Sequence, residues 1–318
     1  MRVNMASHFL AQGYRVEFVL RAAGGELREL LPAQVSVVEL GAARVRNAFF
    51  PLRRYFRRRR PDAVLVSLWP LTAVAILAWR SAGLHGPILV SDHNNLARAY
   101  AGRGWLHHQF LRWSIHLIYP LATARVAVSA GVANSMAALG RLPESTFQVI
   151  YNPAAAAPGA SGIALDTNRE WGGDGPLVLA VGRLKRQKNY PLLLAAMALL
   201  RKQVPAVLLI LGDGDLLEEL TALRAELQLD PFVRFAGFVP HPAPYYQSAD
   251  LFVLSSDYEG FGNVLVEALA SGLPVVATDC DHGPREILAD GEFGELVPTG
   301  DPAALAQAMA RQLAAAPD

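Results

Sequence analysis

The sequence predicts an α/β protein with two doubly wound domains, in which helices cover both faces of a parallel sheet. Short, continuous apolar runs recur along the chain, and several end in glycine, which is typical of buried parallel strands. Segments with the helical spacing of apolar residues separate these runs. The length of 318 residues suits two domains of about 150 residues each.

Composition excludes several other classes of protein. Hydrophobic residues make up 52% of the chain and charged residues 18%, so it can build a sizeable core and is not a disordered chain. Its one cysteine, Cys280, cannot form an internal disulfide or a thiolate metal cluster, which favours a reducing, cytoplasmic compartment. We expect no signal peptide. An uncharged run at 63–79 is interrupted by Pro70 and is better explained by a buried strand, a turn and a helix than by a membrane span.

Residues 1–152 are expected to form the first domain. A helix is predicted over 1–11, where apolar residues share one face, and Gly13 ends it. Strands are predicted at 14–20, 35–40, 63–68, 87–91, 125–129 and 147–150, with helices between most of them. A doubly wound domain normally opens with a strand and a phosphate-facing loop. Because this chain opens with a helix and stops directly after one, we expect it to be trimmed at both ends, without its first strand.

Residues 153–175 are rich in alanine, glycine and proline and lack periodicity, so they are predicted to be a linker. Residues 176–318 are expected to form the second domain. Its predicted strands are 176–182, 206–212, 233–236, 251–255, 274–278 and 294–297. Its predicted helices are 189–204, 215–228, 243–248, 263–271 and 302–315.

The two halves carry opposite charge. Residues 1–160 contain 18 arginines, no lysine and 7 acidic residues, whereas residues 161–318 contain 11 basic and 21 acidic residues. Eight arginines fall within 44–60, interleaved with aromatic residues and ending in Arg57, Arg58, Arg59 and Arg60. This cluster is either a solvated helix end or a contact for anionic lipid headgroups. Nucleic acid is not an expected partner, since no recognition motif accompanies the charge.

In open α/β sheets, ligands bind beyond the carboxyl ends of strands, so the residues after each strand are candidates. Gly182 is followed by four cations and then a helix. Those cations are Arg183, Lys185, Arg186 and Lys188. A helix N-terminus and clustered cations favour an anion such as a diphosphate, although a solvated loop would have the same sequence.

A second candidate loop contains Glu259 and leads into a helix that contains Glu267. Gly260 and Gly262 would let the backbone approach a ligand closely. Glu267 lies among apolar residues and therefore needs a partner, which could be a structural cation or the diol of a ribose. His93 follows a strand of the first domain, and its position alone distinguishes it from an ordinary structural histidine.

These motifs together resemble those of the retaining glycosyltransferases of family 4, which have the GT-B fold of two Rossmann-like domains facing across a cleft. The resemblance covers nearly the whole chain. It rests on Gly182-Arg183-Leu184 with Lys188, Gly212-Asp213-Gly214, Glu259-Gly260-Phe261-Gly262 with Glu267, and Gly283-Pro284-Arg285-Glu286.

The resemblance implies a role for each candidate residue. Arg183 and Lys188 would hold the diphosphate of a nucleotide-sugar donor beside Gly182, and Glu267 would hold its ribose. Glu259 would lie by the transferred sugar, and His93 between acceptor and donor sugar. The backbone of the loop after Glu259 would complete the donor site, through Gly260, Phe261, Gly262, Asn263 and Val264.

The implied reaction moves a sugar to an acceptor hydroxyl with retention of configuration, and needs no cofactor besides the donor. A saccharide or a lipid-linked acceptor suits the basic half, with the chain cytoplasmic and peripheral on the inner face of the membrane. Three alternatives remain. Asp213 and Asp279 each begin an Asp-x-Asp pattern that a metal-dependent GT-A enzyme would use. A nucleotide-sugar 2-epimerase shares the two-domain architecture, and a fragment of this kind could bind donor without catalysis.

Overall fold

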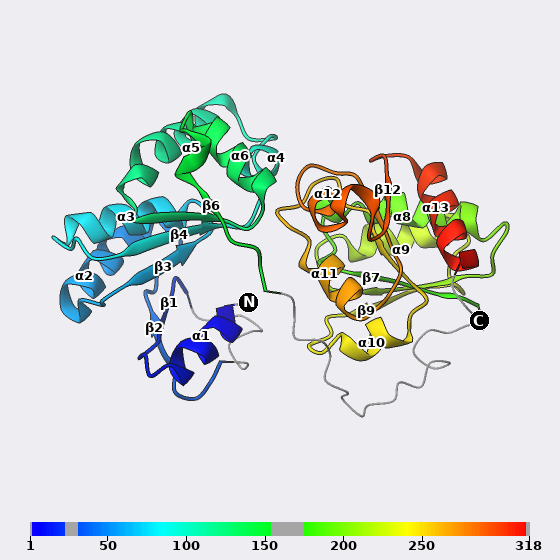
Figure 1. Ribbon diagram of the computed structural model, residues 1–318, viewed down its shortest axis with the longest axis horizontal. Helices are drawn as coiled ribbons and strands as arrows, with labels where there is room; N and C mark the ends of the chain where they lie inside the picture. The colour runs from blue at the N-terminus through cyan, green and yellow to red at the C-terminus, as the bar shows by residue number, and fades with distance from the viewer. Residues whose placement is uncertain (1, 23–30, 154–174, 316–318) are drawn as a thin grey trace. The chain divides into compact units, whose positions relative to one another are not determined.

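The computed structural model describes residues 2–22, 31–153 and 175–315. The chain divides into two compact units, residues 1–153 and 154–318, and the strands of each unit pair in parallel (Figure 1). Apart from residues 153 and 175, the predicted linker lies outside the described residues. No helix in the described ranges is both long enough and apolar enough to cross a bilayer.

The first unit alternates strands and helices after an opening helix. Its elements are α1 (Arg2–Ala11), β1 (Glu17–Leu20), β2 (Ser36–Glu39), η2 (Val45–Ala48), α2 (Phe49–Arg59), β3 (Val64–Ser67), α3 (Leu71–Ser81), β4 (Ile88–Asp92), α4 (Leu96–Ala99), α5 (Trp105–Ile118), η3 (Tyr119–Leu121), β5 (Ala124–Ala127), α6 (Ala130–Gly140), η4 (Glu144–Thr146) and β6 (Gln148–Val149).

The strands of this unit form two sheets rather than one. The larger sheet has four parallel strands in the order β3-β4-β5-β6, and β1 pairs in parallel with β2 as a separate two-stranded sheet. The sequence predicted each of these strands but not the division. The unit has two sheets because β1 pairs with β2 and β3 pairs with β4, and no described strand pairs β1 with β3.

Aromatic packing joins α2 to α3 in this unit. The rings of Phe56 and Trp79 meet edge to face with centroids 5.1 Å apart, and both side chains are buried. Trp79 also donates its indole N–H to the carbonyl of Gly86, 3.1 Å away, which satisfies its polar atom inside the core. The apolar helix predicted after Pro70 therefore packs in the core of this unit, against α2 and the sheet.

The second unit follows the predicted alternation closely. Its elements are β7 (Leu177–Val181), η5 (Arg186–Lys188), α8 (Tyr190–Leu200), β8 (Val207–Leu211), α9 (Leu217–Glu226), β9 (Val233–Gly237), α10 (Ala243–Ser248), β10 (Leu251–Leu254), α11 (Asn263–Ala270), β11 (Val275–Thr278), α12 (Pro284–Ile287), η6 (Ala289–Gly291), β12 (Glu295–Val297) and α13 (Pro302–Ala315).

The six strands of this unit are parallel, in the order β12-β11-β10-β7-β8-β9. The chain runs from β7 outward to β8 and β9, then returns to β10 on the other side of β7. The order therefore reverses between β7 and β10, and their carboxyl ends mark the place where doubly wound proteins bind ligands.

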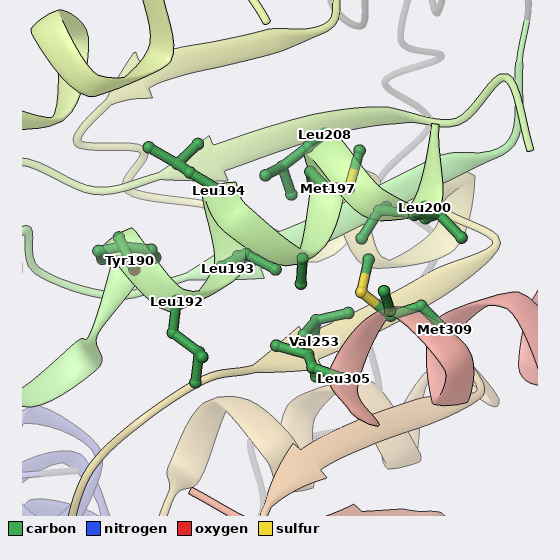
Figure 2. Close-up of a cluster of buried hydrophobic side chains, with 14 of the residues drawn as sticks. Tyr190, Leu192, Leu193, Leu194, Met197, Leu200, Leu208, Val253, Leu305 and Met309 are labelled. Atoms are coloured by element: carbon green, nitrogen blue, oxygen red, sulfur yellow. The ribbon is translucent and has the colours of Figure 1, made fainter. Parts of the chain in front are cut away.

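The core of this unit joins α8 and α13 to the sheet. All five residues of β8 are buried, as a strand covered on both faces requires. Figure 2 shows side chains of α8, α13 and β10 packed together. They include Leu193, Met197, Leu200, Val253, Leu305 and Met309. The rigid sheet and helices hold the loops after β7 and β10 in fixed positions.

Candidate functional site

The loops after β7 and β10 meet at the point where the strand order reverses. Gly182 follows β7 with φ 155°. A Cβ atom at this position would lie 2.8 Å from Cε of Lys188, so only glycine leaves room for the lysine side chain. Tyr190 donates its hydroxyl to the carbonyl of Gly182, 2.9 Å away, and anchors the start of α8 there.

The contact at the centre of this site is an ion pair between Lys188 and Glu259. Lys188 Nζ lies 2.7 Å from Glu259 Oε1, and the two side chains are only 12% and 9% exposed. Ser256 donates its hydroxyl to the same carboxylate oxygen, 2.7 Å away. Gln187 Nε2 lies 3.4 Å from Oε2. Three side-chain donors therefore orient the carboxylate of Glu259, which is buried at the end of β10.

Further hydrogen bonds fasten the two loops to each other. Ser255 donates to the carbonyl of Lys188 at 2.8 Å, and Asn189 Nδ2 donates to Asp257 Oδ1 at 2.7 Å. The backbone N–H of Asp257 donates to the carbonyl of Gln187 at 2.9 Å. Asn189 also caps α8, because its side-chain oxygen accepts from the N–H of Leu192 at 3.3 Å. Lys188 thus sits in a rigid frame directly before a helix N-terminus.

The other cations of this loop face solvent. Arg183, Lys185 and Arg186 are exposed, and Arg183 forms no ion pair with any residue that the structure describes. Lys188 alone is half-buried and paired. The predicted cation cluster therefore consists of one lysine held in place and three exposed cationic side chains. These three remain available to an anion at the start of α8.

The loop that follows Glu259 leads into α11. Gly260, Phe261 and Gly262 lead to the N-terminus of this helix, which begins at Asn263 and continues with Val264. A Cβ atom at Gly283 would lie 1.9 Å from the carbonyl oxygen of Phe261, so glycine at that position lets the next loop pack directly against this one. The loops after β10 and β11 therefore pack against each other beside the N-terminus of α11.

The hydrogen-bond partner of Glu267 is a tyrosine hydroxyl, and among the described residues it forms no ion pair within 4.0 Å. It is half-buried on α11, and Tyr246 of α10 donates its hydroxyl to Glu267 Oε2 at 2.9 Å. Burial raises the pKa of Glu267, and this hydrogen bond opposes the shift. The hydrogen bond from Tyr246 engages only Oε2, and a residue that binds a diol needs a second carboxylate oxygen of this kind.

The first aspartate of each Asp-x-Asp pattern makes a local contact. Asp213 Oδ1 accepts from the N–H of Gly214 at 2.7 Å, and Asp279 accepts from Arg285 Nε at 3.0 Å. In the described part of the chain, no group of three or more His, Cys, Asp or Glu side chains is arranged to hold a metal ion.

The first unit contains a cavity of about 290 Å³ at the carboxyl ends of β3 and β4. Trp69, Asp92, His93, Tyr100 and Arg103 are among its lining residues. The rings of Trp69 and Tyr100 lie 5.0 Å apart, and Trp69 is fixed by a hydrogen bond from its indole N–H to Ser114 Oγ at 2.9 Å. His93 Nε2 lies 2.9 Å from Ser91 Oγ. The predicted His93 is therefore part of a pocket with aromatic walls.

Asp92 is a site residue that the sequence analysis missed. It is 2% exposed, and its Oδ1 accepts from Tyr119 at 3.0 Å, while the Tyr119 hydroxyl also lies 2.9 Å from Thr72 Oγ1. Asp92 Oδ2 has no hydrogen-bond partner among the described residues. Burial raises the pKa of Asp92 to about 7, although the Tyr119 hydrogen bond lowers it. Its place directly before His93, at the end of a predicted strand, was the available signal.

The arginine cluster lies on α2 and at its end, and the aromatic residues among the arginines differ in exposure. Arg57, Arg58, Arg59 and Arg60 are exposed. Among the aromatic residues of the cluster, Phe56 is buried in the core against Trp79, and the Tyr55 hydroxyl donates to Glu17. Leu52 and Phe56, four residues apart, form the buried face of α2. Phe50 is the aromatic residue of this cluster that is well exposed.

Family comparisons cover both units. The sequence model described as Glycosyltransferase Family 4 matches residues 3–156, and the one described as Glycosyl transferases group 1 matches residues 175–315. The two matches together include Lys188, Glu259 and Glu267 of the second unit and the cavity of the first unit.

Two relatives with named activities match part of this chain. The Campylobacter jejuni N-acetylgalactosamine-N,N'-diacetylbacillosaminyl-diphospho-undecaprenol 4-alpha-N-acetylgalactosaminyltransferase is 35% identical over 186 residues, 58% of this chain and 49% of that protein. The lipopolysaccharide core biosynthesis glycosyltransferase LpsE of Rhizobium meliloti is 38% identical over 137 residues, 43% of this chain and 39% of that protein. The matches thus span about half the length of the first relative and less of the second.

A solved structure shares the fold. The crystal structure of Anabaena Alr3699/HepE in complex with UDP-glucose superposes with a TM-score of 0.79 at 23% identity, and the match covers 96% of this chain and 84% of that chain. The predicted GT-B fold with two Rossmann-like domains is confirmed by this likeness together with the parallel sheets.

Proposed function

The chain belongs to family 4 of the glycosyltransferases, among the group 1 enzymes, and from that we propose that it moves a sugar from a nucleotide-diphosphate sugar to an acceptor hydroxyl with retention of configuration. The observation that carries the proposal is the Lys188–Glu259 ion pair at the switch point of the second sheet. It joins the residue proposed for the diphosphate to the residue proposed for the transferred sugar.

The donor diphosphate is proposed to bind Lys188 and Arg183 at the N-terminus of α8. When the bond to the sugar breaks, negative charge develops on the leaving diphosphate, and fixed cations and helix amides stabilise it most where water is excluded. Lys188 meets this condition because it is half-buried and held by Glu259. We propose a uridine nucleotide, since the similar fold of HepE was solved with UDP-glucose.

The two glutamates are proposed to divide the donor between them. Glu267, with one oxygen bound by Tyr246, would accept a hydrogen bond from the ribose. Glu259 would lie beside the sugar, where its charge and its contact with Lys188 align the anomeric carbon with the diphosphate. The loop from Gly260 to Val264 would contribute backbone contacts at the start of α11.

Divalent metal is proposed to be unnecessary for the reaction. Asp279 is bound by Arg285, and the contact of Asp213 is to its own loop backbone. Positive charge for the leaving group would come from Arg183, Lys188 and α8 instead.

The acceptor is proposed to bind the pocket of the first unit. Asp92 Oδ2 would accept a hydrogen bond from an acceptor hydroxyl, and His93 would lie between that hydroxyl and the donor sugar. Aromatic walls and a buried carboxylate suit a saccharide, whose apolar faces stack on rings and whose hydroxyls need acceptors. We propose a lipid-linked saccharide, because one relative is named for a diphospho-undecaprenol acceptor and another for lipopolysaccharide core biosynthesis.

A peripheral contact with an anionic membrane is proposed for the exposed arginines at the end of α2. The first half of the chain is strongly basic and the second half acidic, so the first unit would face the headgroups. The apolar residues that accompany these arginines at the surface are few, which makes this contact mainly electrostatic.

The experiment that tests the function is a donor screen followed by a transfer assay. UDP-, GDP- and ADP-sugars are compared by thermal shift, and the best donor is incubated with a diphospholipid-linked saccharide. The anomeric configuration of the product is then read by NMR. Donor consumption without acceptor, with inversion at C2 of the sugar, would indicate an epimerase, and donor binding without turnover would indicate a binding fragment.

A further inference from the structure

The helix α5 of the first unit presents apolar side chains to solvent along most of its length. The exposed fractions are 70% for Trp105, 76% for Leu106, 59% for Phe110, 58% for Trp113 and 59% for Leu117. The last four recur at intervals of three and four residues, so they form one stripe along the helix. We call these four residues the α5 stripe.

The α5 stripe is separate from the side of the helix that packs in the core. Leu111, Ser114 and Ile115 are buried, and α5 packs against α6 and α3 of its own unit. A helix with one apolar side is explained by core packing alone. A second apolar side that faces solvent over three helical turns is a contiguous patch, which marks an interaction surface.

The charge around α5 limits what can cover this patch. From residue 93 to residue 143 the sequence contains five arginines and four histidines but no acidic residue. Arg103 lies just before α5 and is exposed, and Arg112 lies within the helix. Two copies that met through this surface would bring two acid-free basic segments together, which electrostatic repulsion opposes. An anionic surface meets the same residues favourably.

We propose that the α5 stripe docks the first unit on an anionic lipid bilayer, with its side chains in the interfacial region and the neighbouring arginines at the headgroups. Tryptophan, phenylalanine and leucine on one side of a helix, with basic residues beside them, match the pattern of helices that lie in the plane of a membrane surface. The helix has 14 residues, so it lies on the bilayer and does not span it.

The docked face lies beside the pocket that contains Asp92. The ring centroids of Phe110 and Trp69 are 6.0 Å apart, and Trp69 lines that pocket. Docking through α5 would bring the pocket next to the headgroups, where the saccharide of a lipid-linked acceptor is found. This surface differs from the arginines at the end of α2, because it supplies apolar burial as well as charge. The docking itself requires neither donor nor transfer activity.

Vesicle binding by the intact chain tests the proposal. Co-sedimentation is measured with vesicles of phosphatidylcholine alone and with added phosphatidylglycerol, at low salt and at 1 M salt. Binding to the anionic vesicles is expected to weaken in high salt but not to vanish, because apolar burial is not screened. Emission from Trp105 and Trp113 should shift to shorter wavelength on binding.

The decisive variant replaces Leu106, Trp113 and Leu117 by glutamine and leaves Phe110 against Trp69. We expect the partition coefficient to fall by at least about tenfold, since three large apolar side chains no longer leave water. Phe293→Gln, at an exposed phenylalanine of the acidic unit, is the matched control and should bind as the unchanged chain does. Thermal unfolding should be nearly unchanged in both, because the substituted side chains are exposed.

Three results would overturn the proposal. The folded, unchanged chain could ignore anionic vesicles at low salt. The triple variant could bind them as well as the unchanged chain does. Light scattering could show that the unchanged chain is a dimer and the triple variant a monomer, which would assign the α5 stripe to contact with a second copy. The vesicle assay contains no donor, so its failure would leave the glycosyltransferase proposal standing. That proposal is tested separately, by transfer to a water-soluble acceptor.

Discussion

Lys188 and Glu259 are 71 residues apart in the chain, yet Lys188 Nζ lies 2.7 Å from Glu259 Oε1 across the loops that follow β7 and β10. Each residue therefore fixes the other. Lys188 needs the carboxylate because it is half-buried, and Glu259 needs the cation because it is buried. A donor that binds Lys188 meets a cation already held in place, so less side-chain entropy is lost on binding.

Lys188→Ala is expected to weaken binding of a nucleoside diphosphate by about 1.5–3 kcal/mol, the value of a hydrogen bond to a charged group. It should also lower the melting temperature, because Glu259 would remain buried without its cation. Arg183→Ala should weaken binding without that loss, since Arg183 is exposed. Calorimetric titration and thermal unfolding measure the two effects. Lys202→Ala removes the same charge at an exposed position and serves as control. Unchanged affinity in both site variants would contradict the assignment.

Glu267→Gln and Glu259→Gln are expected to have different effects. Glu267→Gln should weaken binding of the free nucleoside diphosphate, because the ribose loses its acceptor. Glu259→Gln should leave that binding nearly intact and lower kcat, because its proposed contact is with the sugar. Titration with the free nucleotide and steady-state kinetics with the complete donor separate the two. Equal effects on free nucleotide would refute the division of roles.

Tyr246→Phe gives an internal check on Glu267. Burial raises the pKa of Glu267 and the Tyr246 hydrogen bond lowers it, so removing the hydroxyl should raise the pKa further. A carboxylate that must be ionised to bind ribose then becomes protonated at higher pH. Nucleotide affinity should therefore begin to fall at a higher pH in the variant as the solution is acidified.

Catalysis is expected to continue without divalent metal. Transfer should be unchanged by a chelator and should not be stimulated by Mg²⁺ or Mn²⁺, because cations of the chain itself would stabilise the leaving diphosphate. Asp279→Asn should lower stability slightly through the loss of its exposed contact with Arg285 and should leave kcat intact. Activity lost with chelator and restored by metal would favour the GT-A alternative.

The replacement of Arg57, Arg58, Arg59 and Arg60 by glutamine is expected to reduce binding to anionic vesicles mainly at low salt. Each basic residue near such a surface contributes about 1 kcal/mol, and the screening length falls to about 3 Å at 1 M salt. The expected residual binding at high salt belongs to the α5 stripe. Equal binding by the variant and the unchanged chain at low salt would show that these arginines are only a solvated helix end.

Much of the second unit could be predicted from its sequence because buried parallel strands and helices have distinct periods. The helix predicted at 243–248 has those bounds as α10. The helix predicted at 189–204 ends instead at Leu200, because apolar spacing continues into the turn before Pro205 and does not mark where hydrogen bonding stops. The separate pairing of β1 and β2 was not predictable, since strand order depends on contacts between distant segments.

The candidate site was predicted as a set of loops but not as a set of contacts. Strand ends identified Lys188, Glu259 and His93, yet nothing in the sequence indicated that the first two form an ion pair. The burial of Phe56 did have a signal in the sequence, because its four-residue spacing from Leu52 places both residues on one face of the helix. The burial of Asp92 depends on Tyr119 and Thr72, which come from other elements and cannot be paired with it from sequence alone.

Because Asp92 is buried, the stability of the first unit is expected to depend on pH. Burial raises its pKa from 3.8 to about 7, so between these values the folded chain holds a proton that the unfolded chain releases. The contribution of Asp92 to stability is therefore complete below about pH 4 and is lost as the pH rises toward 7. Asp92→Asn should remove this dependence, whose total size is on the order of a few kcal/mol. Denaturant unfolding from pH 4 to pH 8 measures it. Asp62→Asn, at an exposed position of the same unit, should leave it unchanged.

The ionisation of Asp92 should also change KM for the acceptor, but it should not change the affinity for the donor. An ionised Asp92 accepts a hydrogen bond from the acceptor hydroxyl, so KM for the acceptor should fall as the pH rises through about 7. His93, Tyr100, Tyr119 and Arg103 also face the pocket or Asp92, and His93 could produce a pH profile of its own. Asp92→Asn separates the two, because a profile that comes from His93 would survive it. The acceptor role of Asp92 requires that the variant have a flat KM profile and bind the donor as before.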